Sequence, residues 1–161
     1  MITQERLKEV LHYDPETGIF IRILRTGNNN GCKVGKPVGT DCHGYLSIGI
    51  DFRRHSLHRL AWLYMNGSYP IDKIDHINGN KSDNRFCNLR EASSYVNMQN
   101  IRHPKMGNKS GFLGVHKVRD KWRTSITANG KRINIGYYET PELAYAAYLE
   151  SKRIHHEGCT I

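Results

Sequence analysis

A polar stretch, RHPKMGNKS at residues 102–110, divides the chain of 161 residues into a longer first part and a shorter second part. Pro104 and Gly107 disfavour regular structure there, which is typical of a linker between domains. Hydrophobic residues make up only 38% of the chain, a low share for one large core. The sequence therefore predicts two modest hydrophobic cores, in residues 1–101 and 111–161.

Short helices and strands are expected before the linker. The spacing of Leu7, Val10 and Leu11 predicts one helical face, and Gly67 is a typical helix stop. Alternation of apolar residues indicates strands elsewhere. The expected elements are helices at 3–12 and 58–67, strands at 19–23, at 45–52 and from 53 onward, and a short helix beginning near Ser93. We interpret residues 25–40, rich in Gly, Asn and Lys, as a loop that could lie on a phosphate backbone.

The second part carries the signals of one sheet and one helix. Turns at 120–121 and 129–131 separate three predicted strands, at 112–118, 121–128 and 131–138. Thr140 as N-cap and Pro141 at the first helical position predict a helix over 140–156. The expected apolar stripe of this helix is Leu143, Ala144, Ala147, Tyr148 and Ile154. A three-stranded sheet backed by a helix can fold by itself, and we expect the whole chain to be of the α+β class.

The chain is strongly basic, with a formal net charge of +9. Residues 1–100 hold 13 Lys and Arg against 10 Asp and Glu, whereas residues 101–161 hold 11 against 5. A surplus of this size implies an anionic partner, most commonly nucleic acid. Charge alone does not separate DNA from RNA or from an acidic membrane surface.

No run of the sequence approaches eighteen apolar residues, and the N-terminus lacks an apolar signal-like stretch, so we expect a cytoplasmic protein without membrane contact. The four cysteines, Cys32, Cys42, Cys87 and Cys159, form no C-x-x-C pair. We interpret them as free thiols. A zinc site of Cys32, Cys42 and His43 is the lesser alternative, and structural zinc is not expected.

One segment, DHINGNKSDNRFCNL at residues 75–89, surrounds a single histidine with Asn and Asp. Hydrolysis of a phosphodiester needs a base for water, and His76 suits neutral pH. It also needs a hard divalent cation, which prefers carboxylate and amide oxygens. Asp75 is adjacent to His76, and Asn97 follows on the helix near Ser93. Neighbours in an extended segment point to opposite faces, so Asp75 and His76 need a local bend to share a site.

The longer pattern, HRLAW at 58–62 and DHINGNKSDNRFCNLREASSYVNMQN at 75–100, resembles the HNH endonuclease family in its phage and intron homing branch. The resemblance implies a ββα-metal nuclease domain over residues 1–101, with its motif core at 58–100.

Roles for four residues follow from this resemblance. It implies that Asp75 and Asn97 bind the metal, that His76 is the general base, and that Asn88 braces the loop through hydrogen bonds. Asp and Asn at the two metal positions favour Mg²⁺ or Mn²⁺ over softer metals.

Other polar residues nearby have simpler explanations. Five are expected to shape the loop as turn formers: Asn78, Gly79, Asn80, Asp83 and Asn84. Arg85 is either a surface charge or a phosphate contact. His58 is more typical of a structural histidine, although its place beside Arg59 leaves a DNA-contact role open.

Motifs at fixed spacing also mark the second part: Gly-Val at 114–115, Lys-Trp at 121–122, NGKR at 129–132, IGYYET at 135–140 and A-x-x-A-Y in the last helix. They resemble the plant APETALA/ethylene-response-factor DNA-binding domain, which implies a sheet lying in the DNA major groove. Leu113, Ser125 and Asn134 stand where that family usually has Arg, Glu and Trp, so its usual base sequence should not be transferred.

The DNA contacts expected on this basis lie mostly in the second part: His116, Arg119, Lys121, Arg123, Thr127, Lys131, Arg132 and Asn134, with Arg59 and Arg85 in the first part. Trp122 is expected to pack in the fold rather than stack on a base.

The sequence thus predicts a Mg²⁺-dependent HNH endonuclease that hydrolyses double-stranded DNA in a bacterial or phage-infected cell. A monomer would nick one strand, and a homodimer could cut both. Two alternatives remain open: a DNA-binding transcriptional regulator with an inactive nuclease motif, and an RNA-binding module.

Overall fold

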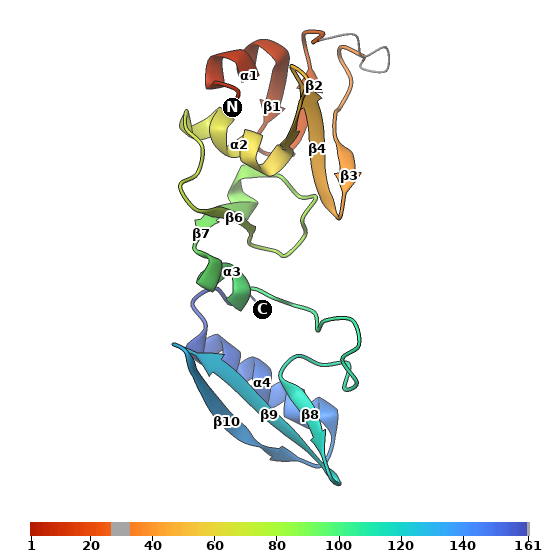
Figure 1. Ribbon diagram of the computed structural model, residues 1–161, viewed down its shortest axis with the longest axis vertical. Helices are drawn as coiled ribbons and strands as arrows, with labels where there is room; N and C mark the ends of the chain where they lie inside the picture. Colours follow the sequence, from red (N-terminus) through yellow and green to blue (C-terminus); the bar gives the residue numbers. More distant parts are fainter. Residues whose placement is uncertain (27–32, 161) are drawn as a thin grey trace. The chain divides into compact units, whose positions relative to one another are not determined.

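The computed structural model describes residues 1–26 and 33–160 (Figure 1). The chain forms two compact units, Met1–Ser93 and Ser94–Ile161. Both units combine helices with antiparallel strands, which confirms the α+β class. The loop expected at 25–40 lies partly outside the described residues. In the described part of the chain, no helix has the length and apolar character needed to cross a membrane.

The first unit begins with a helix capped by Thr3, whose hydroxyl accepts a hydrogen bond from the Arg6 N–H. This helix is shorter than the expected 3–12, because the buried Leu11 pairs with Arg22 in a strand instead. In chain order the elements are α1 (Gln4–Val10), β1 (Leu11–Asp14), β2 (Ile19–Arg22), β3 (Thr40–Cys42), β4 (Tyr45–Ile50), β5 (Arg53–Ser56), α2 (Leu57–Asn66), β6 (Lys73–His76), a 3₁₀ turn (Phe86–Asn88) and β7 (Leu89–Ala92).

Three antiparallel sheets organise this unit: β1–β2, β3–β4–β5 and β6–β7. The strand expected at 45–52 ends at Ile50, because Asp51 and Phe52 form the turn into β5. Gly67 adopts the left-handed conformation that ends α2, as expected. One hydrophobic core joins α1, α2 and the strands: Leu7, Val10, Leu11, Tyr13, Phe20, Ile48, Ile50, Leu57, Leu60, Ala61, Leu63, Ile74 and Leu89.

The second unit is a three-stranded sheet packed on one long helix, as predicted (Figure 1). Its elements are α3 (Ser94–Gln99), β8 (Val115–Val118), β9 (Lys121–Ala128), β10 (Lys131–Tyr138) and α4 (Pro141–His155). The strands are antiparallel in the order β10-β9-β8, with a bulge between Asn134 and Gly136. Gly114 allows close packing, since a Cβ there would lie 2.3 Å from the Tyr148 ring.

Helix α4 buries a narrower stripe than the sequence predicts. Ala144, Tyr148 and Lys152 are buried, but Leu143 is 55% and Ile154 72% exposed, so the prediction was wrong for these two. A helix contacts a small sheet along one row of side chains, and Leu143 and Ile154 lie outside that row.

The stretch expected to be a linker, residues 102–110, lies within the second unit. Contacts from distant residues hold its beginning in place. Lys152 Nζ donates to the Ile101 carbonyl oxygen at 2.6 Å, and the Arg102 guanidinium donates to the Thr160 carbonyl oxygen at 3.0 Å. The functional boundaries predicted from the sequence stay predictions.

Cys42, Cys87 and Cys159 form no disulfide among the described residues. Cys32, a member of the alternative zinc site, lies outside the described residues. Among residues 1–26 and 33–160, no three His, Cys, Asp or Glu side chains are grouped as a metal site made of such residues would require.

Candidate active site

The β6–β7 hairpin carries Asp75 and His76 side by side in the chain. Asp75 lies opposite Arg90 and His76 opposite Leu89, in regular antiparallel register. Both side chains are buried, with exposed fractions of 6% and 4%. Asp75 Oδ2 accepts hydrogen bonds from Arg90 Nε at 3.0 Å and Nη2 at 2.8 Å. Strand pairing continues through both positions, and a catalytic site shared by Asp75 and His76 stays a prediction.

The His76 ring is enclosed by an amide and two other rings. Its Nε2 lies 3.4 Å from Asn84 Oδ1, which accepts a hydrogen bond from Nε2 in the tautomer that carries its proton on that nitrogen. The ring centroids of His58 and Tyr45 lie 5.3 and 5.9 Å away. Burial lowers the pKa of His76, against the opposing effects of the Asn84 hydrogen bond and of Asp75. A neutral imidazole protonated at Nε2 carries its lone pair on Nδ1, as a general base requires.

His58, on α2, is a second imidazole packed beside His76. Burial first, and then the nearby charges of His76 and Arg59, lower the pKa of His58 to about 4. Its Nδ1 is buried without a hydrogen-bond partner among the described residues. The Tyr45 ring lies 5.3 Å from it, and Lys81 Nζ stands 4.8 Å from the centre of that Tyr45 ring. His58 therefore has the environment of a packed, neutral histidine.

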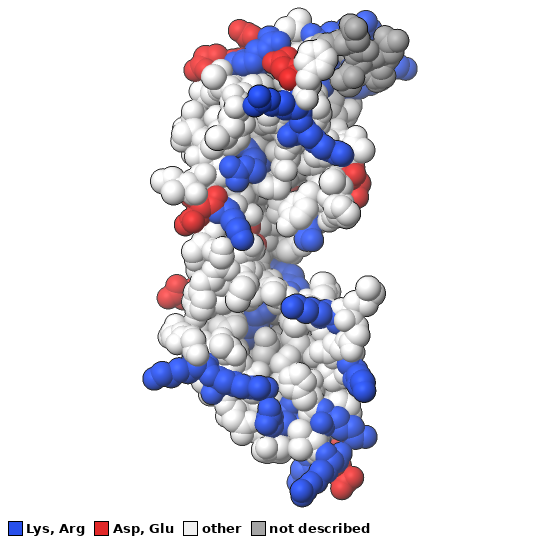
Figure 2. All heavy atoms as spheres, viewed as in Figure 1, with Lys and Arg blue, Asp and Glu red and all other residues white. Residues whose placement is uncertain are grey.

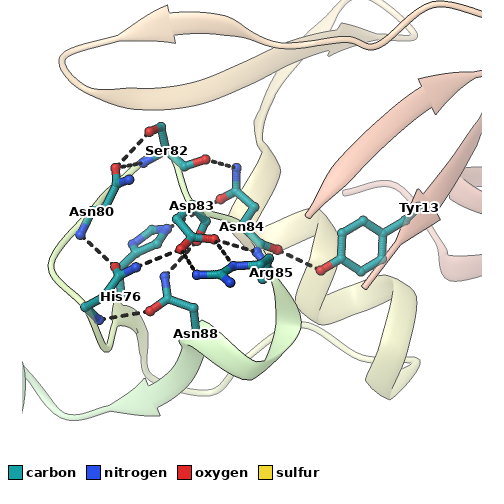
Figure 3. A network of polar contacts seen from close by, with 9 residues as sticks. Tyr13, His76, Asn80, Ser82, Asp83, Asn84, Arg85 and Asn88 are labelled. Carbon is teal, nitrogen blue, oxygen red and sulfur yellow. Dashed lines mark hydrogen bonds and ion pairs between the residues drawn. The ribbon is translucent and has the colours of Figure 1, made fainter. Parts of the chain in front are cut away.

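Asn and Asp side chains close the loop between β6 and the 3₁₀ turn (Figure 3). Asn78 Oδ1 accepts from the Asn80 N–H at 2.8 Å, and Asn80 Oδ1 accepts from both the N–H and the hydroxyl of Ser82. Asn78 Nδ2 donates to Asp83 Oδ2 at 2.7 Å. Gly79 takes the left-handed conformation with φ of 74°. These residues shape the loop through local hydrogen bonds, as turn formers do.

Asn88 joins the two ends of this loop. Its Oδ1 accepts from the Asn78 N–H at 2.9 Å, and its Nδ2 donates to the Asp83 carbonyl oxygen at 2.8 Å (Figure 3). Asn84 differs from the other expected turn formers, because it is 2% exposed and contacts His76. No spacing pattern in the sequence indicated this contact or the packing of His58 against His76.

The β1–β2 hairpin supports the loop from a distant part of the sequence. The Tyr13 hydroxyl donates to the Asn84 carbonyl oxygen at 2.7 Å (Figure 3), and the Phe86 N–H donates to the Pro15 carbonyl oxygen at 3.0 Å. Gly18 approaches so closely that a Cβ there would lie 2.4 Å from the Arg85 nitrogen. The position of the loop therefore depends on the turn after β1.

Two arginines of this unit were predicted DNA contacts. Arg85 is about half exposed and binds Asp83 through Nε at 2.9 Å and Nη2 at 2.6 Å. Chiefly through this hydrogen bonding, Arg85 lowers the pKa of Asp83 to about 2. The Arg59 guanidinium lies 5.6 Å from the Tyr69 ring centre. Contact of either arginine with DNA stays a prediction.

Asn97, the second expected metal ligand, lies on α3 in the second unit, whereas Asp75 lies in the first. Its helix is fastened at both ends within the second unit. The Tyr95 hydroxyl accepts from the Asn129 N–H at 2.7 Å, and Gln99 Oε1 accepts from the Gly158 N–H at 2.9 Å. A metal site made of Asp75 and Asn97 stays a prediction.

Basic and polar residues occupy the sheet face opposite α4. In β9, Arg123, Ser125 and Thr127 occupy alternate positions with the buried Thr124, Ile126 and Ala128, and Ser125 is itself buried. Their cross-strand partners are His116 and Tyr137 for Arg123, Asn134 for Ser125, and Arg132 for Thr127. Arg132 Nε donates to Ser125 Oγ at 3.0 Å. Five of the predicted contacts thus share one face: His116, Arg123, Thr127, Arg132 and Asn134.

The remaining predicted contacts of this unit lie at the strand ends. Arg119 stands in the β8–β9 turn with φ of 54°, Lys121 pairs with Glu139 at 3.0 Å, and Lys131 begins β10. Figure 2 shows Lys and Arg side chains spread over this unit, with few Asp or Glu side chains on the face in view. The unit therefore presents a basic surface.

Comparison with known proteins identifies a family match for part of the chain. Residues 55–99 match the family model for HNH endonucleases, a range that includes Asp75, His76, Asn88 and Asn97. A stretch of 103 residues, 61% of the chain, is 36% identical to protein 3.8 of Escherichia phage T7 and covers 83% of that protein. No solved structure matches the chain.

Proposed function

Because the chain belongs to the same family as protein 3.8 of Escherichia phage T7 and carries an HNH endonuclease domain over residues 55–99, we propose that it is a metal-dependent endonuclease of double-stranded DNA. The observation that carries this proposal is the His76 imidazole, buried beside Asp75 and hydrogen-bonded to Asn84 inside the matched region.

His76 is the general base of the proposed reaction. With Nε2 directed at Asn84 Oδ1, Nδ1 takes a proton from water. The water attacks phosphorus in line with the 3′ oxygen, which leaves, so the products carry a 5′-phosphate and a 3′-hydroxyl. The hydrogen bonds of Asn88 keep the loop closed around the histidine.

Asp75 and Asn97 are the proposed ligands of Mg²⁺ or Mn²⁺. A carboxylate and an amide oxygen fit the preference of a hard cation, and HNH nucleases generally use a divalent metal. The cation would neutralise phosphate charge and stabilise the departing oxygen. Because Arg90 already donates two hydrogen bonds to Asp75 Oδ2, cation binding must share that carboxylate with the arginine or displace it.

The basic face of the β8–β9–β10 sheet is the proposed DNA-binding surface. Its side chains alternate with the buried face, so they can reach base edges in the major groove together. Arg123 lies between His116 and Tyr137 in the cross-strand row, and its Nε is buried without a partner among the described residues. We assign Arg123 to the centre of this contact.

Plasmid nicking tests the proposal. Supercoiled DNA containing a cognate site is incubated with Mg²⁺ and wild-type protein, His76→Ala or Asp75→Ala. The wild type should nick, and loss of the base should slow nicking by about a hundredfold or more. Asp75→Ala should lose Mg²⁺ dependence along with activity.

Exposed residues of the same type provide the controls: His12→Ala and Asp41→Ala should nick at the wild-type rate. Thermal unfolding shows whether each variant is folded. If folded His76→Ala nicks as fast as the wild type, His76 is not the base.

The ion pair between Asp75 and Arg90 favours one alternative function. A carboxylate held by arginine could be closed to metal, which would leave a DNA-binding regulator with an inactive nuclease motif. This alternative predicts tight duplex binding without nicking at any Mg²⁺ or Mn²⁺ concentration. Competition between duplex DNA and RNA of the same sequence distinguishes the endonuclease and the DNA-binding regulator from an RNA-binding module.

A further inference from the structure

A basic groove lies on the β3–β4–β5 sheet of the first unit, and none of its lining residues is among those assigned above. Its volume is about 580 Å³, and four cationic side chains line it: Lys33, Lys36, Arg53 and Arg54. No Asp or Glu is among its described lining residues. Four cations without a counter-charge create a positive field that attracts phosphate groups.

A hydrogen bond between neighbouring strands orients one cation of the groove. Arg54 Nε donates to Ser47 Oγ at 2.8 Å, across the β4–β5 pairing. Asp51, the carboxylate nearest in the sequence to Arg53 and Arg54, is engaged elsewhere, since Arg6 binds its two oxygens at 3.0 and 3.1 Å. The cations of the groove therefore keep their charge unopposed at its rim.

An aromatic ring stands beside these cations. Phe52 also lines the groove, and it is 96% exposed at the tip of the β4–β5 hairpin. The two turn residues, Asp51 and Phe52, have φ of 46° and 63°, which a two-residue hairpin normally assigns to Asn or Gly. A bulky residue in this conformation is unfavourable, so the hairpin holds an exposed ring at a cost to folding.

We propose that this groove and Phe52 form a second DNA-contacting surface, in which the cations bind the phosphodiester backbone and the Phe52 ring wedges against a base step. The inference rests on the proposed function, because it takes duplex DNA as the ligand. Proteins that unstack a base step use an apolar wedge flanked by basic side chains, and the hairpin tip has that composition. Its role is to anchor and locally distort the duplex, in addition to the contacts of the β8–β9–β10 sheet.

Duplex binding measured by fluorescence anisotropy tests whether the cations of the groove bind the phosphodiester backbone. The groove variant Lys36→Ala/Arg53→Ala leaves the Arg54–Ser47 hydrogen bond intact and removes two charges. The matched control, Lys8→Ala/Lys105→Ala, removes two charges from exposed lysines outside the groove. We expect the groove variant to bind about tenfold more weakly and to lower the slope of log affinity against log salt by about two, relative to the control.

Plasmid unwinding tests the wedge without any need to know the target site. A relaxed plasmid is treated with topoisomerase in the presence of His76→Ala protein, which cannot nick by the proposed mechanism. The resulting distribution of topoisomers is compared with the distribution obtained with His76→Ala/Phe52→Gly protein. Unwinding by the first protein and its loss in the second are expected. Ile71→Gly, at another fully exposed apolar residue of the same unit, is the control and should unwind normally.

Phe52→Gly also separates a wedge from a structural role, because glycine relieves the left-handed backbone. The variant should have a higher midpoint of thermal unfolding than the wild type while losing unwinding. Equal affinity and salt slope in the groove and control variants would overturn the inference, and so would unwinding that survives Phe52→Gly. Duplex binding without any nicking would overturn only the proposed function.

Discussion

The imidazoles of His58 and His76 lie with ring centroids 5.3 Å apart, so a proton on one disfavours a proton on the other. Burial is the largest cause of the lowered pKa of each ring. The rings of Tyr45 and His76 face His58, and Arg59 adds a like charge. His58 therefore helps to keep the neighbourhood of His76 free of positive charge at neutral pH.

The same shift makes folding depend on pH. The pKa of His58 is about 4 in the folded protein and 6.5 in the unfolded chain. The unfolded chain therefore binds the proton first, and the free energy of unfolding falls as the pH decreases through this window. His58 alone accounts for a decrease of about 3 kcal/mol. Urea denaturation of wild type and His58→Phe at several pH values measures the difference.

An exposed histidine of the same unit, in the variant His12→Phe, serves as the comparison. Titration of His76 contributes to the pH dependence of stability in the wild type, His58→Phe and His12→Phe alike. The expectation is wrong if His58→Phe loses stability below pH 6.5 as steeply as the wild type.

Single site residues could be predicted from the sequence where their side-chain chemistry suits the proposed reaction. The composition of residues 75–89 and its resemblance to a nuclease motif singled out Asp75, His76 and Asn88. Their neighbours could not be identified in this way, because His58 and Tyr45 come from α2 and β4. Only the fold brings those side chains to the histidine. Asn84 was close in the sequence, but its burial against His76 depends on how the loop closes.

At the scale of elements, the turn between β1 and β2 packs against the loop that follows His76 and holds it in position. Gly18 has φ of 72°, and a Cβ there would meet the Arg85 nitrogen at 2.4 Å and the Asn84 carbonyl carbon at 2.6 Å. Both obstacles are backbone atoms, which cannot rotate away as a side chain can. Any side chain at position 18 therefore displaces the loop that holds His76.

We expect Gly18→Ala to destabilise the first unit by roughly 3 kcal/mol or more, from left-handed strain together with the backbone clash. Gly35→Ala is the matched control, because Gly35 has φ of 78° but no atom within 4 Å of the added Cβ. It should cost only the strain, about 1 kcal/mol. Urea unfolding followed by the fluorescence of Trp62, which packs 5.8 Å from Phe86, measures both.

Equal destabilisation by the two substitutions would show that the clash at Gly18 relaxes without cost. Nicking by Gly18→Ala at the wild-type rate would show in addition that the loop does not need this support.

Elements were predicted well where local signals are strong and less well at their ends. The Thr140 cap, the Asn129-Gly130 turn and Gly67 marked real boundaries. The end of α1 was misplaced because Leu11 has the apolar character of the helix face but pairs with Arg22. The strand β3 (Thr40–Cys42) was not expected and begins at the last residue of the expected loop 25–40, since its short edge pairing with β4 has no alternating apolar pattern.

For the whole molecule, each unit has a hydrophobic core of its own. The first surrounds Leu60, and the second contains Val115, Ile126 and Ala144. The low apolar content predicted two modest cores, and two are present. The division falls after Ser93 rather than at 102–110, because contacts such as Gln99 with Gly158 join residues too far apart for sequence patterns to reveal.

The two tryptophans, Trp62 and Trp122, report on one unit each. In a Trp62→Phe background, Ile126→Ala should lower the unfolding midpoint seen by Trp122, since deleting a buried Ile side chain costs about 2–5 kcal/mol. In a Trp122→Phe background, the same substitution should leave the Trp62 transition in place. Urea titration of both single-tryptophan proteins measures these midpoints.

Leu60→Ala is the reciprocal variant, and it should shift only the Trp62 transition. If either substitution moves both transitions equally, the two cores unfold as one cooperative system.

The hydrogen bond from the Tyr13 hydroxyl to the Asn84 carbonyl oxygen joins residues 71 positions apart. During synthesis on the ribosome, the first hairpin therefore waits for most of the first unit to emerge before the loop around His76 can close. Contacts of such long sequence separation form late, since they pay the entropy of a large closed loop. In a nascent chain the loop around His76 would thus close only after residue 84 has emerged, whereas the groove residues at positions 33–54 emerge earlier.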